Sequence, residues 1–164
     1  MTVIVVMGVS GSGKTTVGEQ LAERLGVEYA EADAFHPKAN IEKMSAGHPL
    51  TDEDREPWLR AIEKWIAGHQ RTGGVVSSSA LKRRYRDELR EGGKVWFLHL
   101  HGERDLLAER IKNREGHFFP VSLLDSQLAD LEPLQPDEPG RVVEITDPPA
   151  DLVEAALVAF RERA

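Results

Sequence analysis

A glycine-rich turn between a hydrophobic strand and a helix most constrains what this chain can fold into. Residues 8–15 read GVSGSGKT, which matches the pattern G-x-x-x-x-G-K-[ST]. Residues 3–7 before the turn are all apolar, as in a strand that helices cover on both faces of a parallel sheet. Apolar residues follow the turn at helical spacing, at Val17, Leu21, Ala22 and Leu25. The order of strand, turn and helix therefore predicts a phosphate-binding loop.

The residue types of this turn suit the binding of nucleotide phosphates. Its glycines let the backbone curl so that successive N–H groups face phosphate oxygens, and the helix that follows adds its partial positive charge. We expect Lys14 to reach the β- and γ-phosphates of ATP and the Thr15 hydroxyl to bind Mg²⁺. The predicted phosphate-binding residues are Gly8, Ser10, Gly11, Ser12, Gly13, Lys14, Thr15 and Thr16. The loop does not identify the molecule that accepts the phosphate.

Four further strands are predicted along the chain, each separated from the next by a helical or polar stretch. They cover residues 27–31, 74–79, 94–100 and 141–146. This alternation predicts a three-layer α/β fold with a five-stranded parallel sheet flanked by helices. The 164 residues suit a single domain over residues 1–164, with a polar, helix-rich insert at about 34–73 and a lid region at about 110–135.

Charge and composition exclude several classes of partner. A net charge of −7 and a pI near 5.4 argue against general binding to nucleic acid or to an anionic membrane. The apolar stretch at the start is too short to span a bilayer and lacks the features of a signal peptide. Cysteine is absent, which excludes disulfides and thiolate metal sites and suits a reducing compartment. We therefore expect a cytoplasmic protein that binds neither nucleic acid nor membranes.

Two acidic residues after the second predicted strand are candidates for metal binding and proton transfer. Glu31 and Asp33 lie at the carboxyl edge of the predicted sheet, where folds of this type bind their ligands. One of them could face metal-bound water while the other accepts the proton of an attacking hydroxyl. An ordinary acidic loop is the alternative reading of the same spacing.

Several basic residues are candidates for binding anionic groups. Lys82 and Arg86 are four residues apart and share one side of a predicted helix, whereas the other basic residues of that helix can face solvent. Arg55 could hold a carboxylate with its planar guanidinium or lie exposed at the surface. Arg110 and Arg114 precede a glycine and two phenylalanines. This arrangement suits either a lid that closes over the nucleotide or a helix end stabilised by its arginines.

Two histidines near the end of the fourth predicted strand raise the question of a zinc site. His99 and His101 share one face of the strand, but no third ligand follows at a spacing typical of zinc. We therefore favour packing, or a polar face of the sheet, over metal binding.

Together with the loop, four further segments resemble one known family. The chain is similar to the gluconokinases of the thermoresistant type, which are small P-loop kinases related in fold to shikimate and nucleoside monophosphate kinases. The resemblance covers almost the whole chain. The four segments are DAFHPKANIEKMSAGHPLTDEDREPWL at 33–59, SALKRRYRDELR at 79–90, GHFF at 116–119 and LLDSQLADLEPL at 123–134.

The resemblance implies a P-loop kinase fold with a helical substrate-binding insert and a lid. The implied activity is ATP-dependent phosphorylation of the terminal hydroxyl of D-gluconate to 6-phospho-D-gluconate, with release of ADP. This reaction would feed gluconate into the pentose phosphate or Entner–Doudoroff route. ATP and Mg²⁺ are the implied cofactors, gluconate is the small-molecule partner, and a homodimer is the implied assembly.

The resemblance also implies roles for individual residues. Lys14, Asp33 and Arg114 are the implied catalytic residues, with Asp33 as the base that also contacts the sugar acid. Arg110 would lie against adenine, and Arg114 would reach the phosphates. Glu31 would join Thr15 at the metal. The implied substrate-binding residues are Asp33, Arg55, Ser79, Lys82, Arg86 and His117.

The chain departs from the family pattern at two positions. Family members often have an aspartate where this chain has Glu31 and a cysteine where it has Ser78. The extra methylene of Glu31 still allows contact with metal-bound water, and serine is nearly isosteric with cysteine. The first departure bears on the geometry of the metal, and the second is expected to have little effect.

Two other functions compete with this interpretation. A related kinase with shikimate or a nucleoside monophosphate as acceptor would share the loop. A monophosphate acceptor needs arginines on its phosphate, and the insert offers only lysines between Asp33 and Arg55. A nucleotide-sensing or assembly protein would bind ATP without a small acceptor, which would leave the segment FHPKANIEKM without a purpose.

Overall fold

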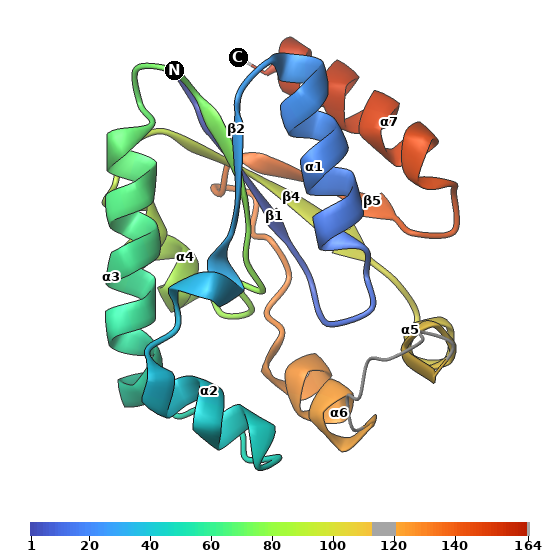
Figure 1. Ribbon diagram of the computed structural model, residues 1–164. Helices are drawn as coiled ribbons and strands as arrows, with labels where there is room; N and C mark the ends of the chain where they lie inside the picture. Colours follow the sequence, from blue (N-terminus) through green and yellow to red (C-terminus); the bar gives the residue numbers. More distant parts are fainter. Residues whose placement is uncertain (113–120, 164) are drawn as a thin grey trace.

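Five parallel strands form the centre of the molecule, and helices cover both faces of the sheet (Figure 1). The computed structural model describes residues 1–112 and 121–163. The strands lie side by side in the order β2-β3-β1-β4-β5, so the strand that precedes the glycine loop is central. Their bounds are Val3–Met7 for β1, Glu28–Glu31 for β2, Gly74–Ser77 for β3, Val95–His101 for β4 and Gly140–Glu144 for β5.

The helices follow the strands in the alternation that a parallel sheet requires, because each parallel connection must cross back over the sheet. Between β2 and β3 the chain forms a short 3₁₀ helix and two α-helices, which make up the predicted insert. The bounds are Lys14–Leu25 for α1, Ala32–Phe35 for η1, Lys38–Ser45 for α2, Asp52–Gly68 for α3, Arg83–Arg90 for α4, Arg104–Lys112 for α5, Val121–Asp130 for α6 and Pro149–Glu162 for α7.

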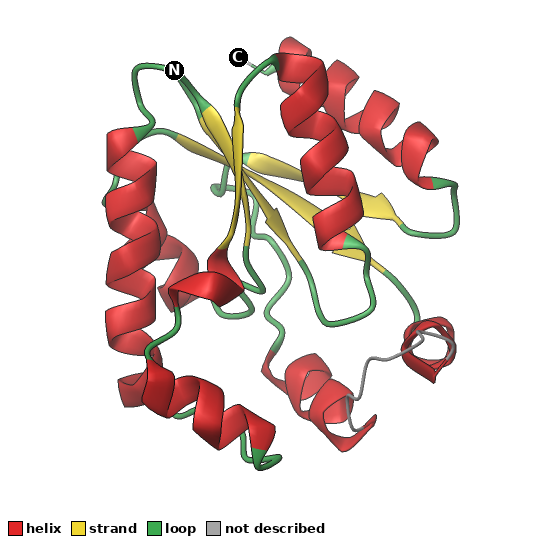
Figure 2. Cartoon of the chain, in the orientation of Figure 1, coloured by secondary structure: helices red, strands yellow, loops and turns green. Residues whose placement is uncertain are grey.

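Helices lie on both faces of the sheet (Figure 2), and each face has its own hydrophobic core. Ile4 and Val6 of β1 pack in the core that includes α1 and α7, whereas Val5 and Met7 pack in the core that includes α3 and α4. Successive side chains of a strand point to opposite faces. An uninterrupted apolar run is therefore needed in β1, which helices bury on both sides.

Thr51 caps the start of α3. The Thr51 hydroxyl accepts a hydrogen bond from the backbone N–H of Asp54 at 3.1 Å, and the Asp54 carboxylate accepts one from the Thr51 N–H at 2.8 Å. The two bonds make a capping box. Lys43 of α2 also donates to the Asp54 carboxylate at 2.6 Å, so the cap ties α2 to α3.

The predicted α/β fold with its five-stranded parallel sheet is confirmed. The strands begin and end within a few residues of the predicted positions. The fifth strand is an edge strand that ends at Glu144, earlier than predicted, and its residue Val142 is 43% exposed. In the described parts of the chain, no helix combines the length and the hydrophobicity needed to cross a bilayer.

His99 is part of the sheet, as the packing interpretation predicts. The residue lies in β4 between Met7 of β1 and Val142 of β5, and its side chain is buried. Its Nδ1 has no hydrogen-bond partner among the described residues. A buried imidazole with an unpaired nitrogen favours the neutral form. Burial, followed by the neighbouring His101, accordingly lowers the pKa of His99 from 6.5 to about 4.

Replacing His99 by leucine is expected to reduce the loss of stability in mild acid. The unfolded chain, in which the histidine pKa is ordinary, binds the proton first as the pH falls, so protonation favours unfolding between pH 6.5 and 4. The stabilisation from a neutral His99 is therefore complete above pH 6.5 and lost towards pH 4, and it amounts to roughly 3 kcal/mol. Urea unfolding at both ends of this range measures the effect. An equal loss of stability in the wild-type and variant proteins would contradict it.

Candidate active site

The glycine loop joins β1 to α1 at the carboxyl edge of the sheet. Gly8 has φ +148° and Gly11 has φ +85°, backbone conformations that L side chains rarely adopt. A Cβ on Gly8 would lie 2.8 Å from the Leu100 carbonyl oxygen, and one on Gly11 would lie 3.1 Å from Cγ1 of Ile111. Both the curl of the loop and the close approach of β4 and α5 therefore require glycine at these positions.

Lys14 lies over the loop that it follows. Its Nζ donates to the carbonyl oxygens of Gly8 at 2.9 Å and Val9 at 3.1 Å. These bonds hold the ammonium group against the turn, beside the amino end of α1. A positive charge at this place, combined with the helix dipole, makes a local anion site in a protein of net negative charge.

The other predicted residues of the loop are placed differently. Ser12 is buried, and its hydroxyl donates to the Val9 carbonyl oxygen at 2.7 Å, so its side chain stabilises the turn. Thr16 is exposed in the first turn of α1. The backbone N–H of Ser10 donates to Oε1 of Gln127 at 2.8 Å, which places α6 against the loop.

Thr15, Glu31 and Tyr29 form a hydrogen-bonded group beside the loop. The Thr15 hydroxyl donates to Oε1 of Glu31 at 2.5 Å, and the Tyr29 hydroxyl donates to the same oxygen. The Tyr29 oxygen also lies 2.8 Å from Oγ of Ser77. Burial, followed by the bond to Glu31, raises the pKa of Tyr29 well above its usual value, so its hydroxyl stays protonated and remains a donor.

The oxygens of Thr15 and Glu31 could hold Mg²⁺. Hydroxyl and carboxylate oxygens are ligands of the kind that this ion binds, usually with water and substrate phosphates completing the octahedron. Residues 1–112 and 121–163 contain no group of three or more His, Cys, Asp or Glu suited to a metal. The donor set therefore fits an ion that binds together with a nucleotide.

Asp33 lies in η1, directly beyond β2. The indole Nε1 of Trp58, from α3, donates to the Ala32 carbonyl oxygen at 2.7 Å, and the His36 ring stacks on the Trp58 ring at a centroid distance of 4.4 Å. These contacts anchor η1 to α3 on both sides of Asp33. The Asp33 side chain itself is exposed. Glu31 therefore contacts Thr15 beside the loop, while Asp33 is exposed at the same edge of the sheet.

Arg55 and Lys82 come together around one tyrosine. Nη1 of Arg55 donates to the Tyr85 hydroxyl at 2.9 Å, and its guanidinium lies 5.3 Å from the centre of the Tyr85 ring. Nζ of Lys82 lies 5.7 Å from the same ring centre and 3.5 Å from Oδ1 of Asp52. Tyr85 donates to the Asp52 carboxylate, and this bond lowers the pKa of Asp52. Burial and the same bond raise the pKa of Tyr85 to about 12.

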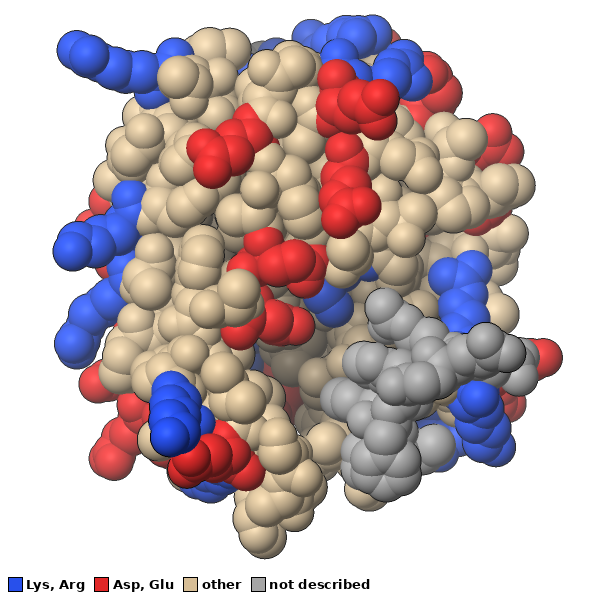
Figure 3. Space-filling model, viewed as in Figure 1, with Lys and Arg blue, Asp and Glu red and all other residues tan. Residues whose placement is uncertain are grey.

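This cluster brings the amino ends of α3 and α4 together, and it offers an anionic ligand two cations and a phenol. Figure 3 shows acidic side chains beside a recess on the face that carries the site.

Ser79, which precedes α4, is half-buried. Its carbonyl oxygen accepts the Gly8 N–H at 3.4 Å. The structure therefore brings Ser79 close to the loop.

Arg86 is not placed as its spacing from Lys82 predicts. Lys82 is the N-cap of α4, with an extended backbone, so the two residues do not share one helical face. The Arg86 side chain is fully buried and pairs with Glu138. The prediction that Arg86 contacts the substrate is therefore corrected: in this conformation it has no surface to present to a substrate.

The lid region is described only in part. Nη2 of Arg110 donates to the Ile145 carbonyl oxygen at 2.8 Å, beyond the end of β5. Because the neighbouring Ile111 packs against Gly11, Arg110 lies near the loop on α5. Arg114 and His117 lie outside the described residues, as does the segment GHFF.

Two contacts of the loop region were not among the predicted site residues. Tyr29 lies two residues before Glu31, so the period of a strand places both side chains on one face, and this signal could have revealed it. Gln127 falls in the segment 123–134, which had a family resemblance but no assigned role. Gln127 and Ser10 are 117 residues apart, so no local sequence pattern predicts their contact.

Comparison with known proteins decides the family. A model of the AAA domain family matches residues 4–117. The gluconokinase of Gluconobacter oxydans (strain 621H) is 54% identical over 142 residues, which cover 83% of this chain and 78% of that protein. The chain belongs to the gluconokinase family. The thermoresistant gluconokinase of Escherichia coli (strain K12) is 42% identical over 159 residues. The match covers 95% of this chain and 91% of that protein.

The solved structures agree with this assignment. The crystal structure of a gluconokinase from Sinorhizobium meliloti 1021 superposes on this gluconokinase-family chain with a TM-score of 0.91 at 51% identity. The match covers 98% of this chain and 91% of that one. The sequence identity and the superposition therefore point to the same family.

Proposed function

We propose that this gluconokinase-family chain transfers the γ-phosphate of ATP to the terminal hydroxyl of D-gluconate, which yields 6-phospho-D-gluconate and ADP. The observation that carries the proposal is the 54% identity with a gluconokinase over 83% of this chain. The placement of Lys14 over the glycine loop supports ATP as the donor. The product would enter the pentose phosphate or Entner–Doudoroff route.

In the proposed reaction, the oxygen of the acceptor hydroxyl attacks the γ-phosphorus of ATP. The bond from that phosphorus to the oxygen that bridges the β- and γ-phosphates breaks, and the hydroxyl proton passes to the Asp33 carboxylate. Lys14 binds the β- and γ-phosphates and stabilises the charge that develops on them. The exposure of Asp33 beyond β2 supports its role as the base, because an acceptor can reach it.

The acceptor would bind between the insert and the start of α4. In this proposal, the helical segment at about 34–73 is the substrate-binding subdomain, and residues at about 110–135 form the lid. Arg55 would hold the gluconate carboxylate, while Ser79 and Lys82 would bind its hydroxyls. The meeting of Arg55 and Lys82 at Tyr85 supports this assignment. A polar pocket of this kind suits a polyhydroxy acid better than an apolar one would.

Thr15 and Glu31 would hold Mg²⁺ in the proposed enzyme, and the ion would neutralise charge on the phosphates when it is bound. Tyr29 would keep the Glu31 carboxylate in place, because its hydroxyl donates to the oxygen that also accepts from Thr15. The bond compensates for the extra freedom of glutamate relative to aspartate.

Replacing Tyr29 by phenylalanine is therefore expected to raise the Mg²⁺ concentration needed for half-maximal activity by roughly tenfold. The rate at saturating Mg²⁺ should change little, because no reacting group is removed. Titration of Mg²⁺ at fixed ATP and gluconate measures the change, and binding of ATP without metal serves as a control. An unchanged requirement for Mg²⁺ would contradict this role.

A coupled assay of ADP release tests the proposed function. Gluconate, shikimate, gluconolactone and AMP are offered separately as acceptors with ATP and Mg²⁺. Turnover is expected with gluconate. Turnover with shikimate but not gluconate would overturn the proposal, and slow ATP hydrolysis that gluconate leaves unchanged would favour a nucleotide-sensing protein.

The described contacts do not favour a nucleoside monophosphate as acceptor. Lys43 of the insert is paired with Asp54 at 2.6 Å, inside the α3 capping box. Lys38 is almost fully exposed on α2. Neither lysine therefore provides the converging cations that a second phosphate group needs.

A homodimer in the cytoplasm completes the proposal. Val142 of β5 and Val158 of α7 are 43% and 49% exposed, and both belong to elements at the β5 edge of the sheet. Light scattering coupled to size exclusion tests the assembly. The absence of cysteine from the sequence suits a reducing compartment.

A further inference from the structure

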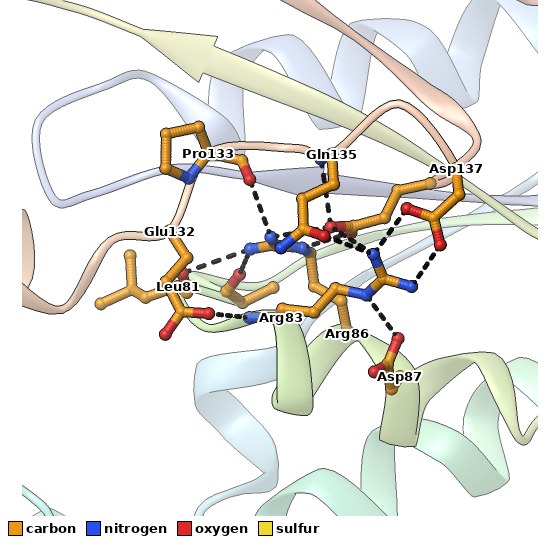
Figure 4. Close-up of polar contacts among 10 residues, drawn as sticks. Leu81, Arg83, Arg86, Asp87, Glu132, Pro133, Gln135 and Asp137 are labelled. Atoms are coloured by element: carbon orange, nitrogen blue, oxygen red, sulfur yellow. Dashed lines mark hydrogen bonds and ion pairs between the residues drawn. The ribbon is translucent and has the colours of Figure 1, made fainter.

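Arg86 is the centre of a buried polar cluster where α4 meets the chain that follows α6 (Figure 4). Its Nε and Nη2 donate to the two carboxylate oxygens of Glu138, at 2.6 and 3.0 Å. Both side chains are fully buried. The charge of the guanidinium is therefore compensated by one carboxylate in a geometry with two parallel bonds.

The remaining donors of Arg86 hold backbone carbonyl groups. Nη1 donates to the carbonyl oxygens of Ala80 at 2.9 Å and Leu81 at 3.2 Å, and Nη2 donates to that of Pro133 at 3.3 Å. A guanidinium has five N–H groups, and here each one has an acceptor. No donor is left over for a ligand, so any effect of Arg86 on a substrate must pass through the groups that it holds.

Ala80 has an unusual backbone conformation. Its φ is +43°, and within residues 1–112 and 121–163 it is the only residue other than glycine with a positive φ. A Cβ makes this left-handed conformation unfavourable, so neighbouring contacts must hold it. Arg86 supplies such a contact at the Ala80 carbonyl, and the backbone N–H of Glu132 supplies a further bond to the Leu81 carbonyl at 2.7 Å.

The strained residue lies inside the acceptor segment, residues 79–82. Ser79 precedes it and bonds through its carbonyl to Gly8 of the glycine loop. Lys82 follows two residues later and lies over the Tyr85 ring with its Nζ near Asp52. The backbone turn at Ala80 therefore sets the direction of both side chains relative to the loop.

We propose that Arg86 is a positioning residue for the acceptor. Through the carbonyl oxygens of Ala80 and Leu81, it holds the backbone that directs Ser79 and Lys82 towards gluconate, and Glu138 compensates its buried charge. The inference rests on the proposed function, because gluconate is the acceptor whose binding it affects. It replaces the predicted direct contact between Arg86 and the substrate.

The variant Arg86→Lys tests this role. Lysine keeps the charge and can pair with Glu138, but its three N–H donors sit on one nitrogen and cannot reproduce the five bonds that Nε, Nη1 and Nη2 of Arg86 make in different directions. The KM for gluconate is expected to rise roughly tenfold or more, because small displacements of binding groups are costly. The KM for ATP should stay nearly unchanged, since the glycine loop keeps its own contacts.

Arg83→Lys is the matched control. Arg83 lies one turn earlier on α4. Its guanidinium pairs with Asp87 and Asp137 and lies 3.6 Å from Oε1 of Glu138, so it shares the counter-charge of Arg86 but has no bond to the carbonyls of Ala80 and Leu81. This variant loses a similar two-bond pair at the same junction. Its KM for gluconate is expected to remain that of the wild type, and a rise equal to that of Arg86→Lys would overturn the proposal.

A second substitution separates positioning from general stability. Glycine adopts a positive φ without the cost that alanine has, so Ala80→Gly in the Arg86→Lys background is expected to recover part of the lost gluconate affinity. A purely structural defect would raise both KM values and would not be rescued by this change. Either of those results, or an unchanged gluconate KM in folded Arg86→Lys protein, would overturn the proposal.

If Arg86→Lys does not fold, Glu138→Gln provides a second test of the proposal. Glu138→Gln keeps the shape of the side chain and one carbonyl acceptor, so a smaller rise in the same KM is expected, and no rise would overturn the proposal. Circular dichroism confirms folding in each case. Absence of gluconate turnover in the wild-type protein would instead refute the proposed function, before any variant is compared.

Discussion

Lys14→Ala is expected to weaken ATP binding and to lower kcat by roughly a hundredfold to a thousandfold, the usual cost of removing one preorganised donor from a transition state. The Nζ of Lys14 lies within 3.1 Å of the Gly8 and Val9 carbonyl oxygens, on the side of the loop that would face phosphates. No other side chain of the loop carries a positive charge. Isothermal titration with ATP and the ADP-release assay measure both effects.

Lys64→Ala is a suitable control for Lys14→Ala, because Lys64 is an exposed lysine on α3. It changes the net charge of the protein equally without altering the loop. Circular dichroism shows whether the loop variant keeps its fold. Unchanged ATP affinity and rate in Lys14→Ala would refute the assignment of the phosphate loop.

Asp33→Asn is expected to lose most turnover while it keeps its affinity for ATP. The amide has nearly the shape of the carboxylate but cannot accept the hydroxyl proton, and a positioned general base contributes about 10²- to 10⁴-fold. Asp33 lies in η1, which Trp58 anchors through the Ala32 carbonyl, so the substitution should not move the backbone. Steady-state kcat with gluconate and titration with ATP give the two quantities.

Asp105→Asn serves as the control for Asp33→Asn. The Asp105 side chain is 99% exposed on α5, so its charge can be removed without disturbing a buried contact. Its turnover should equal that of the wild type. Near-normal turnover in Asp33→Asn would remove Asp33 as the base, and an equal loss in both variants would assign the effect to net charge.

The phosphate loop and its partner Glu31 illustrate how far local patterns reach. Gly8 and Gly11 are recognisable from their spacing, and the structure shows that each needs glycine for its backbone angle and its close neighbours. The spacing of Glu31 and Asp33 left open which of them would lie at the metal, and the family resemblance implied that Glu31 would join Thr15; their oxygens lie 2.5 Å apart. A parallel sheet places the carboxyl ends of its strands at one edge, so topology predicted that Glu31 lies near the loop, while its pairing with Thr15 was implied only by the resemblance.

The positions of the basic side chains near α3 and α4 depended more on tertiary packing than on local sequence patterns. Helical spacing predicted that Lys82 and Arg86 would act together, but α4 begins only at Arg83. Spacing alone favoured an exposed Arg55, whereas in the structure its guanidinium donates to the Tyr85 hydroxyl. Helix ends and side-chain partners depend on energy differences that the hydrophobic pattern does not contain.

The sequence by itself determined the layered fold and the phosphate loop, because glycine spacing and hydrophobic period act between near neighbours in the chain. The family resemblance added gluconate as the expected acceptor. Only the tertiary structure decided where the Arg86 side chain lies, because its partner Glu138 is 52 residues away. A buried charge must find its counter-charge wherever the fold brings one, and no local pattern records which residue that is.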